Sequence, residues 1–227
     1  TLTFDNFLHL IGGSDVDTFF VTSGNTFNGT VDGSLGTDVL TYAGYTSAVQ
    51  VTVTAKGALD GFDGSATGLL NGFHNLDRFV GGNNTADVFT GADLNASFNF
   101  ASGQSYTVDT HFATLSAFEI LNGGSQRDDF VFANGATFNG SLNGGAGVDT
   151  LDYSAYTSSV TSNLLTGTST GVSNGVSNME NLIGGSANDS LTGNDSDNVI
   201  TGNGGDDTLV GNGGADTFIF TAGWGHD

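Results

Sequence analysis

The sequence contains no cysteine and no proline, and its strongly basic side chains are limited to Lys56, Arg78 and Arg127. Disulfides therefore contribute nothing to its stability, and 24 acidic side chains give a formal net charge of −21. This charge excludes binding to nucleic acid and to anionic membrane surfaces, because both need a basic face. The sequence also lacks any run of 18 apolar residues, so we expect no membrane insertion.

A chain with this charge and few apolar residues would be expected to remain disordered. Here 37% of the residues are hydrophobic and 18 are phenylalanine, which favours a folded chain. A fold that metal ions complete accounts for both the charge and the apolar content. The chain starts at Thr1 rather than at methionine and ends inside GWGHD, which resembles the start of another turn. We therefore expect it to be a segment of a larger protein.

Four blocks of nine residues follow one another without a gap over residues 184–219: GGSANDSLT, GNDSDNVIT, GNGGDDTLV and GNGGADTFI. Each block consists of a Gly-rich hexad that ends on Asp or Asn, followed by three strand-type residues with an apolar residue in the middle. A fixed short period indicates a small unit stacked on copies of itself. Two blocks give strand, turn, strand and turn, so we expect the turn at Gly184 to lie against that at Gly202, and Gly193 against Gly211.

Stacking of this kind places the sixth-position acids in a file at roughly the 4.8 Å spacing of neighbouring strands. Carboxylates this close repel one another strongly unless a cation lies between them. Carboxylate oxygens together with the carbonyl oxygens of tight turns form the ligand set that Ca²⁺ prefers. The glycines allow those carbonyls to converge, because Gly adopts positive φ at little steric cost. The pattern therefore predicts several bound Ca²⁺ ions.

The nonapeptide GGxGxDxUx, where U is apolar, is the signature of the RTX (repeats-in-toxin) calcium β-roll. GGAGVDTLD at residues 144–152 matches it at every defined position, and the tandem tract resembles the family in all four blocks. Asn198 replaces the sixth-position Asp and Ala187 the fourth-position Gly, so we expect weaker binding at those two turns. The resemblance implies an all-β fold: a right-handed parallel β-solenoid of the β-roll type, with short strands and Gly/Asp-rich turns.

The remainder of the chain contains an internal duplication. A shift of 111 residues places GSLGTDVLTYAGYTSAV on GGAGVDTLDYSAYTSSV without a gap. We expect the tyrosines of these segments to serve in packing, residues 42–54 to form a strand with one buried face, and residues 57–68 to form a loop. Residues 92–118 receive no firm assignment. The expected organisation is one continuous rod made of the end of a preceding coil (1–11), a first long solenoid module (12–122), a second long module (123–183) and a tandem nonapeptide β-roll (184–227).

The candidate calcium ligands are acids at or near the sixth block position and glycines whose carbonyls line the turns. Asp87 lies in a block that is one residue longer, so it is equally open to a ligand role and to none. Sixth-position acids also suit turns without any metal, and we expect Asp195 and Asp197 to be auxiliary. The full set is Asp17, Asp38, Asp128, Asp149, Asp189, Asp195, Asp197, Asn198, Asp207, Asp216, Asp227, Gly145, Gly147, Gly185, Gly204 and Gly213.

Several features suggest catalysis only superficially. GTSTG at residues 167–171 matches the G-x-S-x-G nucleophile elbow, but no helix signal follows it and only His226 lies downstream. The four histidines form no zinc-binding pattern. Glu119 and Glu180 could form a glycosidase pair, yet both precede a GG block, and equivalent repeat positions favour a shared structural duty. We therefore expect no enzymatic activity and no catalytic residue.

The resemblance implies a secreted bacterial protein, exported unfolded by a type I system and folded outside by calcium. The lack of cysteine fits such a protein. We expect a structural role, as an adhesin, surface-layer or matrix-filament segment that could form a homo-polymer through stacked coil ends. The alternative is the C-terminal secretion and folding module of an enzyme whose catalytic domain lies outside this chain. Carbohydrate or ice binding by a Thr-rich face is a third, weaker hypothesis.

Overall fold

The computed structural model describes residues 7–220 and 225–227. These residues contain strands and turns but no helix, and hence no helix long and apolar enough to cross a membrane. They divide into two compact units: Thr1–Leu94 with Ser105–Leu121, and Asn95–Gln104 with Asn122–Asp227. The all-β fold with many short strands in parallel sheets confirms the predicted fold class, a β-solenoid of the β-roll type.

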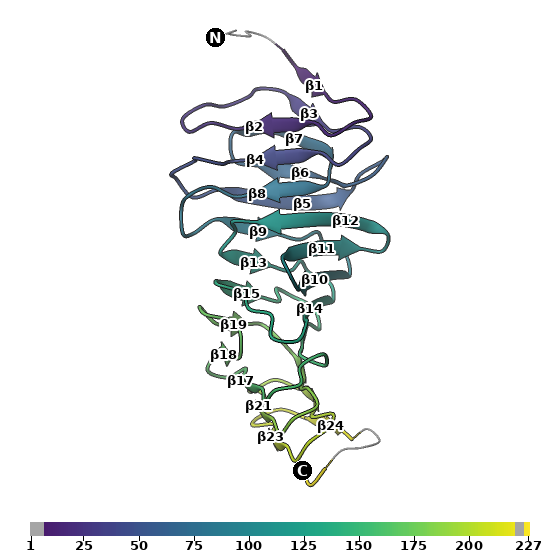
Figure 1. Ribbon diagram of the computed structural model, residues 1–227, viewed down its shortest axis with the longest axis vertical. Coiled ribbons are helices and arrows are strands. Elements are labelled where there is room, and N and C mark those ends of the chain that lie inside the picture. Colours follow the sequence, from purple (N-terminus) through teal and green to yellow (C-terminus); the bar gives the residue numbers. More distant parts are fainter. Residues whose placement is uncertain (1–6, 221–224) are drawn as a thin grey trace. The chain divides into compact units, whose positions relative to one another are not determined.

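The first unit contains two stacks of strands, whose neighbours run in the orders β1-β3-β7-β6-β5-β9-β13 and β2-β4-β8-β12-β11 (Figure 1). Parallel pairs such as β2 with β4 and β4 with β8 keep their apolar residues in register, as in Phe19 beside Leu40 beside Phe79. The strands are β1 (His9–Ile11), β2 (Thr18–Phe20), β3 (Thr30–Asp32), β4 (Val39–Thr41), β5 (Gln50–Lys56), β6 (Phe62–Ala66), β7 (Leu69–Leu76), β8 (Arg78–Val80), β9 (Val88–Thr90), β11 (Gln104–Val108), β12 (His111–Ser116) and β13 (Ile120–Asn122).

Antiparallel pairing interrupts this first unit. Strand β5 has the predicted alternation, with Val51 and Val53 buried between more exposed neighbours. The predicted strand over 42–54 was wrong for residues 42–49, which form a turn and irregular backbone before β5. Strand β5 pairs antiparallel with β6, which in turn pairs antiparallel with β7. The prediction of a loop over 57–68 was therefore wrong for β6. The apolar pattern there is obscured by glycines, and Gly64 is placed where a side chain would meet the Thr52 carbonyl of the neighbouring strand.

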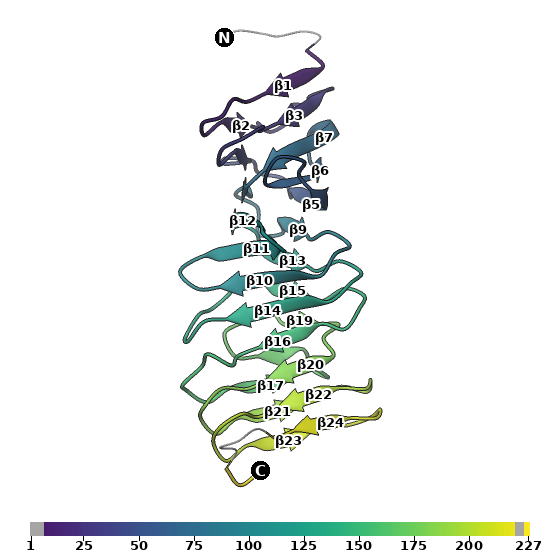
Figure 2. The same ribbon diagram turned by 90° about the vertical axis from the view of Figure 1, so that its right-hand side faces the viewer.

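In the second unit parallel strands follow one another as rungs, in the orders β10-β14-β16-β20-β22-β24, β15-β19 and β18-β17-β21-β23 (Figure 2). Only β17 and β18 pair antiparallel among these. The strands are β10 (Ala96–Phe100), β14 (Asp128–Phe132), β15 (Ser141–Asn143), β16 (Thr150–Asp152), β17 (Thr161–Asn163), β18 (Thr168–Ser169), β19 (Val176–Ser177), β20 (Asn181–Ile183), β21 (Ser190–Thr192), β22 (Val199–Thr201), β23 (Thr208–Val210) and β24 (Thr217–Ile219).

The tandem blocks stack as their period predicts. Leu191 lies beside Leu209 and Ile200 beside Phe218, so each block pairs with the block two further along. Leu191 and Ile200 are fully buried, whereas Ser190 is exposed, because in a three-residue strand only the central side chain points inward. Burying one such side chain contributes about 1.5–3 kcal/mol, so each coil has a narrow core.

Aromatic columns thicken the core beside the tandem tract. Strands β10 and β14 pair in parallel and bring Phe98 onto Phe130 and Phe100 onto Phe132. The rings are stacked, with centroids 4.8 Å and 4.3 Å apart. Such a pair adds about 0.5–1.5 kcal/mol beyond the area that it buries. The aromatic residues of 96–100, which the sequence left unassigned, therefore form part of the core.

The internal duplication is visible in the tyrosines. Tyr42 and Tyr45 meet edge to face with ring centroids 5.5 Å apart, and the equivalent Tyr153 and Tyr156 do the same at 5.1 Å. Tyr42 and Tyr153 are fully buried and donate their hydroxyl hydrogens to backbone carbonyls. The predicted packing role of these tyrosines is confirmed.

Candidate metal sites in the stacked turns

The Gly-rich hexads adopt two conformations, which we name closed and open turns. In a closed turn the sixth side chain accepts the N–H of the second residue of the same hexad, as Asp128 Oδ2 does from Gly124 at 2.7 Å. In an open turn this bond is absent and the second residue has positive φ, as Gly145 does at 100°. The closed turns are 12–17, 81–87, 123–128, 184–189 and 193–198. The open turns are 33–38, 144–149, 202–207 and 211–216.

The fourth residue of an open turn is always glycine, with φ between 93° and 139°. A side chain there would collide with a backbone carbonyl of the closed turn below, as at Gly147 against the Gln126 carbonyl. Closed turns need no such conformation at this position. Ala187, which departs from the nonapeptide pattern, lies in a closed turn and therefore causes no strain. The glycines in question are Gly36, Gly147, Gly205 and Gly214.

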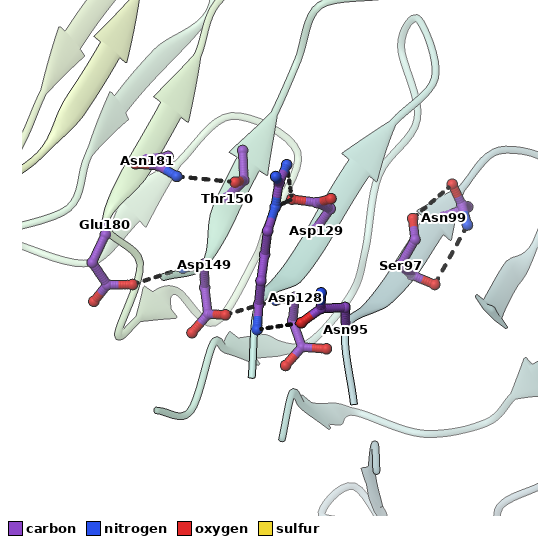
Figure 3. Close-up of polar contacts among 10 residues, drawn as sticks. Asn95, Ser97, Asn99, Asp128, Asp129, Asp149, Thr150, Glu180 and Asn181 are labelled. Atoms are coloured by element: carbon purple, nitrogen blue, oxygen red, sulfur yellow. Dashed lines mark hydrogen bonds and ion pairs between the residues drawn. The ribbon is translucent and has the colours of Figure 1, made fainter. Parts of the chain in front are cut away.

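Each open turn stacks on a closed turn and caps its backbone. Asp149 Oδ1 accepts the N–H of Asp128 at 2.8 Å, and Figure 3 shows the two carboxylates one after the other in a file with Glu180. The same bond joins the sixth residues of all four closed–open pairs: Asp17 with Asp38, Asp128 with Asp149, Asp189 with Asp207 and Asn198 with Asp216. The sequence thus brings the predicted acids together two by two.

In each unit the same kind of bond also joins a turn acid to a carboxylate outside the nonapeptide pattern. Asp149 N–H donates to Glu180 at 2.8 Å, and Asp87 N–H donates to Glu119 at 3.2 Å. Glu119 and Glu180 therefore share the structural duty that their repeat positions predict. Asp77 accepts the N–H of Asp38 in the same way at 3.1 Å, and sequence reasoning missed it. Its alignment with Glu180 in the duplicated segments was the available signal.

Three open-turn acids each have a buried carboxylate oxygen without a hydrogen-bond partner: Asp38 Oδ2, Asp149 Oδ2 and Asp207 Oδ2. Burial, together with the nearby charges of Glu180 and Asp129, raises the pKa of the Asp149 carboxyl to about 6. Burial also raises the pKa values of Asp38 and Asp207. A buried carboxylate without a donor is costly, so each of these positions favours a cation.

The backbone around these oxygens fits a cation with oxygen ligands. Next to the Cα of Gly144, on the side where a side chain would lie, Asp149 Oδ2 and the carbonyl oxygen of Asn178 converge. Asp207 Oδ2 occupies the corresponding cradle at Gly202. Within residues 7–220 and 225–227 no three His, Cys, Asp or Glu side chains cluster for a metal ion. Backbone carbonyls must therefore supply part of each ligand set, as Ca²⁺ readily accepts.

The other predicted ligands lie on or beside these turns. Gly204 N–H donates to the Gly185 carbonyl at 3.2 Å, joining the turns 184–189 and 202–207. Exposed Asp197 accepts the N–H of Ala215 at 2.7 Å. Asp195 borders Gly213 in the neighbouring turn. Asp227 accepts the N–H of Asp207 at 2.7 Å, as a further sixth-position acid would. Residues 223 and 224 of the expected turn over 223–227 lie outside the described residues.

Ser169 of GTSTG lies on β18, which pairs antiparallel with β17, and not on a strand-to-helix turn. Its hydroxyl donates to Ser162 at 2.8 Å and contacts the Tyr153 hydroxyl at 2.7 Å. These contacts assign the serine to packing between strands. The structural surroundings that a nucleophile elbow requires are not found at this position.

Comparison with known proteins agrees with this geometry. Residues 183–218 match the RTX calcium-binding nonapeptide repeat, in 4 copies. The tract that contains the closed–open pairs 184–189/202–207 and 193–198/211–216 is thus a calcium-binding RTX repeat region. No curated protein matches the chain significantly.

Proposed function

We propose that this chain is an extracellular structural segment that folds on Ca²⁺ after secretion and binds one ion at each of three closed–open turn pairs. The pairs are 12–17/33–38, 123–128/144–149 and 184–189/202–207. The observation that carries the proposal is the buried, donor-free carboxylate oxygen at the same place in all three pairs. The first two pairs lie outside the matched nonapeptide repeats, so their assignment rests on geometry alone.

The residues that would hold each ion are the open-turn acid, the closed-turn acid below it and carbonyl oxygens of both turns. For 184–189/202–207 these acids are Asp207 and Asp189. A bound Ca²⁺ supplies two positive charges to a pair of buried carboxylates. Without it the Oδ1 of Asp207 still caps the Asp189 N–H, but Oδ2 keeps an uncompensated charge. Hydrogen bonds within the chain fix the positions of the ligands, and the bound ion neutralises the charge of the two carboxylates.

The energetic balance favours a folding role for calcium. An ion present at about ten times its Kd adds roughly 1.4 kcal/mol per site. The three sites together therefore contribute roughly 4 kcal/mol, which is close to the lower end of the net stability of an ordinary domain, about 5–15 kcal/mol.

The role as an adhesin, surface-layer or filament segment is supported by apolar strands at the ends of the strand orders. Among the described residues, β2 and β24 each have a strand neighbour on one side only. Phe20 on β2 is 66% exposed and Ile219 on β24 is 44% exposed. Unpaired strand edges template further pairing, so we propose that further coils, including those of a second copy, add there. We propose no catalytic activity for the chain.

The proposal is tested by a calcium titration of the purified chain, starting in EGTA and followed by far-UV circular dichroism, with Mg²⁺ as the control ion. We expect the chain in EGTA to keep only part of its strand signal and to melt at a lower temperature. Ca²⁺ should restore the full strand signal cooperatively and Mg²⁺ should not, since Mg²⁺ is smaller and demands strict octahedral geometry. A full strand spectrum in EGTA that calcium leaves unchanged, in signal and in melting temperature, would refute calcium-dependent folding.

A further inference from the structure

The closed–open pair 193–198/211–216 differs from the other three in its side-chain amides. Asn198 Nδ2 donates to the carbonyl oxygen of Glu180 at 3.0 Å and to Asn194 Oδ1 at 3.2 Å. Asn194 Nδ2 donates to the carbonyl oxygen of Met179 at 3.1 Å. Asn212 Nδ2 crosses from the open to the closed turn and donates to the Gly193 carbonyl at 2.9 Å. Three amides thus supply hydrogen-bond donors to three backbone carbonyls of this edge.

The equivalent positions of the other pairs provide fewer donors. In 184–189/202–207 they are Asp189, Gly185 and Asn203, and only Asn203 donates, to the Gly184 carbonyl at 2.7 Å. In 123–128/144–149 they are Asp128, Gly124 and Gly145, none of which has a side-chain donor. The pair 193–198/211–216 therefore replaces one carboxylate by an amide. Asn194 and Asn198 add two donors to backbone carbonyls beyond the one that Asn203 also provides in 184–189/202–207.

The charged groups of this pair also favour a turn pair without a bound cation. Asn198 is buried, neutral and fully hydrogen-bonded, since its Oδ1 accepts the Asn194 N–H at 2.8 Å while its Nδ2 donates. The carboxylates nearby on the closed turn, Asp195 and Asp197, are exposed, so water solvates their charge. The open-turn acid Asp216 lies as in the other pairs, with Oδ1 accepting the Asn198 N–H at 3.0 Å and Oδ2 beside Gly211, but it is only half-buried. The sixth positions of this pair thus hold one carboxylate, where those of the other three pairs hold two.

We propose that the turn pair 193–198/211–216 keeps its conformation without calcium. The side-chain amides of Asn194, Asn198 and Asn212 hydrogen-bond to backbone carbonyls and so replace the stabilising contacts that an ion makes in the other pairs. This inference rests on the proposed function, because it takes the other three turn pairs to be calcium sites. The two coils 184–201 and 202–219 then hold an ion at one edge, between the turns 184–189 and 202–207, and none at the other edge, where the amides satisfy the stacked turns.

The test exchanges the closed-turn residues of two neighbouring pairs. Asn198→Asp installs the carboxylate that the calcium pairs have, and Asp189→Asn installs the amide at the matching position of 184–189/202–207. Bound calcium is counted per chain by elemental analysis after gel filtration at fixed free calcium. Thermal unfolding is followed by circular dichroism in EGTA and in calcium. Asn212→Gly is a third variant, because Asn212 has φ of 73°, which glycine tolerates.

We expect Asn198→Asp to bind one ion more than the wild type and Asp189→Asn one ion fewer. In EGTA, Asn198→Asp and Asn212→Gly should each melt lower by at least about 2–4 °C, the shift that corresponds to one lost hydrogen bond in a chain of this length. In saturating calcium the deficit of Asn198→Asp should disappear, while Asn212→Gly keeps its deficit and its ion count.

The inference is overturned if Asn198→Asp binds as many ions as the wild type while Asp189→Asn loses one, because the pair would then already hold an ion. An unchanged count in Asp189→Asn also overturns it, since an amide would then suffice for binding. If the wild type binds no calcium, the proposed function fails. The melting temperatures in EGTA still decide whether the amides hold this pair.

Discussion

Asp149→Asn separates the two tasks of an open-turn acid. Asp149 is fully buried, its Oδ1 caps the Asp128 N–H at 2.8 Å, and its Oδ2 has no partner. An asparagine keeps the capping oxygen and replaces the unpartnered oxygen by an NH₂ group. This group can donate toward the Asn178 carbonyl, which converges with Asp149 Oδ2 beside Gly144. The substitution therefore removes a buried charge and a calcium ligand at once.

The magnitude follows from the pKa of Asp149. The folded protein holds the proton up to a pKa of about 6, whereas the unfolded chain releases it near 3.8. Stability contributed by this proton is complete below pH 3.8 and is lost as the pH rises through about 6. The full shift corresponds to about 3 kcal/mol, which relaxation of the turn and entry of water around the buried charge reduce to about 1–2 kcal/mol.

The assay is urea denaturation followed by circular dichroism at pH 7.5. In calcium-free buffer we expect Asp149→Asn to be more stable than the wild type by about 1–2 kcal/mol, because the variant carries no charge at this position. In calcium at about 100 times the Kd we expect the order to reverse, because the variant loses the roughly 2.7 kcal/mol that the ion then contributes. Lowering the pH to 4 without calcium should abolish the advantage of the variant.

Asp129→Asn is the matched control, because Asp129 lies near Asp149 but pairs with Arg127 at 3.0 Å outside the turns. It removes the same charge and should change stability by less than about 1 kcal/mol, with no reversal between the two buffers. The reasoning is refuted if Asp149→Asn destabilises the chain equally with and without calcium, since Asp149 would then act only as a backbone cap.

Three further substitutions test an aromatic contact, a buried hydrogen bond and a surface ion pair. Phe130→Ala empties a fully buried site against Phe98 and should cost about 3–5 kcal/mol in urea denaturation; a cost below 1 kcal/mol would contradict the aromatic column. Tyr153→Phe leaves a backbone carbonyl without its donor and should cost about 1–2 kcal/mol, and an unchanged midpoint would argue against that bond. Lys56→Ala breaks the exposed ion pair with Asp109 and should leave the midpoint of urea denaturation unchanged, so a lowered midpoint would show that this pair stabilises the fold.

The stacking of the tandem tract could be predicted because its period leaves a single arrangement. Nine residues make one strand and one turn, so the blocks at Leu191 and Leu209 must lie side by side, as they do. The same argument identified the sixth-position acids as a file along each edge. Local pattern and fold agree here because each coil contacts only its neighbours.

The difference between closed and open turns was visible in the sequence but not interpreted. Glycine at the fourth position marks every open turn, whereas Asp15, Gln126, Ala187 and Ser196 mark four of the closed ones. A single consensus pattern treats the latter as defects. Only the contact between the two stacked backbones explains why one turn of each pair needs the glycine.

The antiparallel strands β5, β6 and β7 could not be predicted from repeat arguments, because they interrupt the repeat. The role of Asp77 was missed for a related reason. It lies outside any Gly-rich hexad, and its bond to the Asp38 N–H depends on which segment follows the open turn in space. Sequence periodicity predicts which blocks are neighbours within the tandem tract. It does not predict which segment follows a turn in space where a long segment replaces the next block.

The most direct measurement is an anomalous difference map from crystals of the chain grown in calcium, recorded at a wavelength where Ca²⁺ scatters anomalously. We predict peaks between the stacked turns beside Asp38, Asp149 and Asp207, coordinated by the oxygens that lack donors, and none beside Asn198. Maps without peaks beside those three aspartates, at calcium concentrations that saturate the chain, would contradict the assignment of these turns as calcium sites.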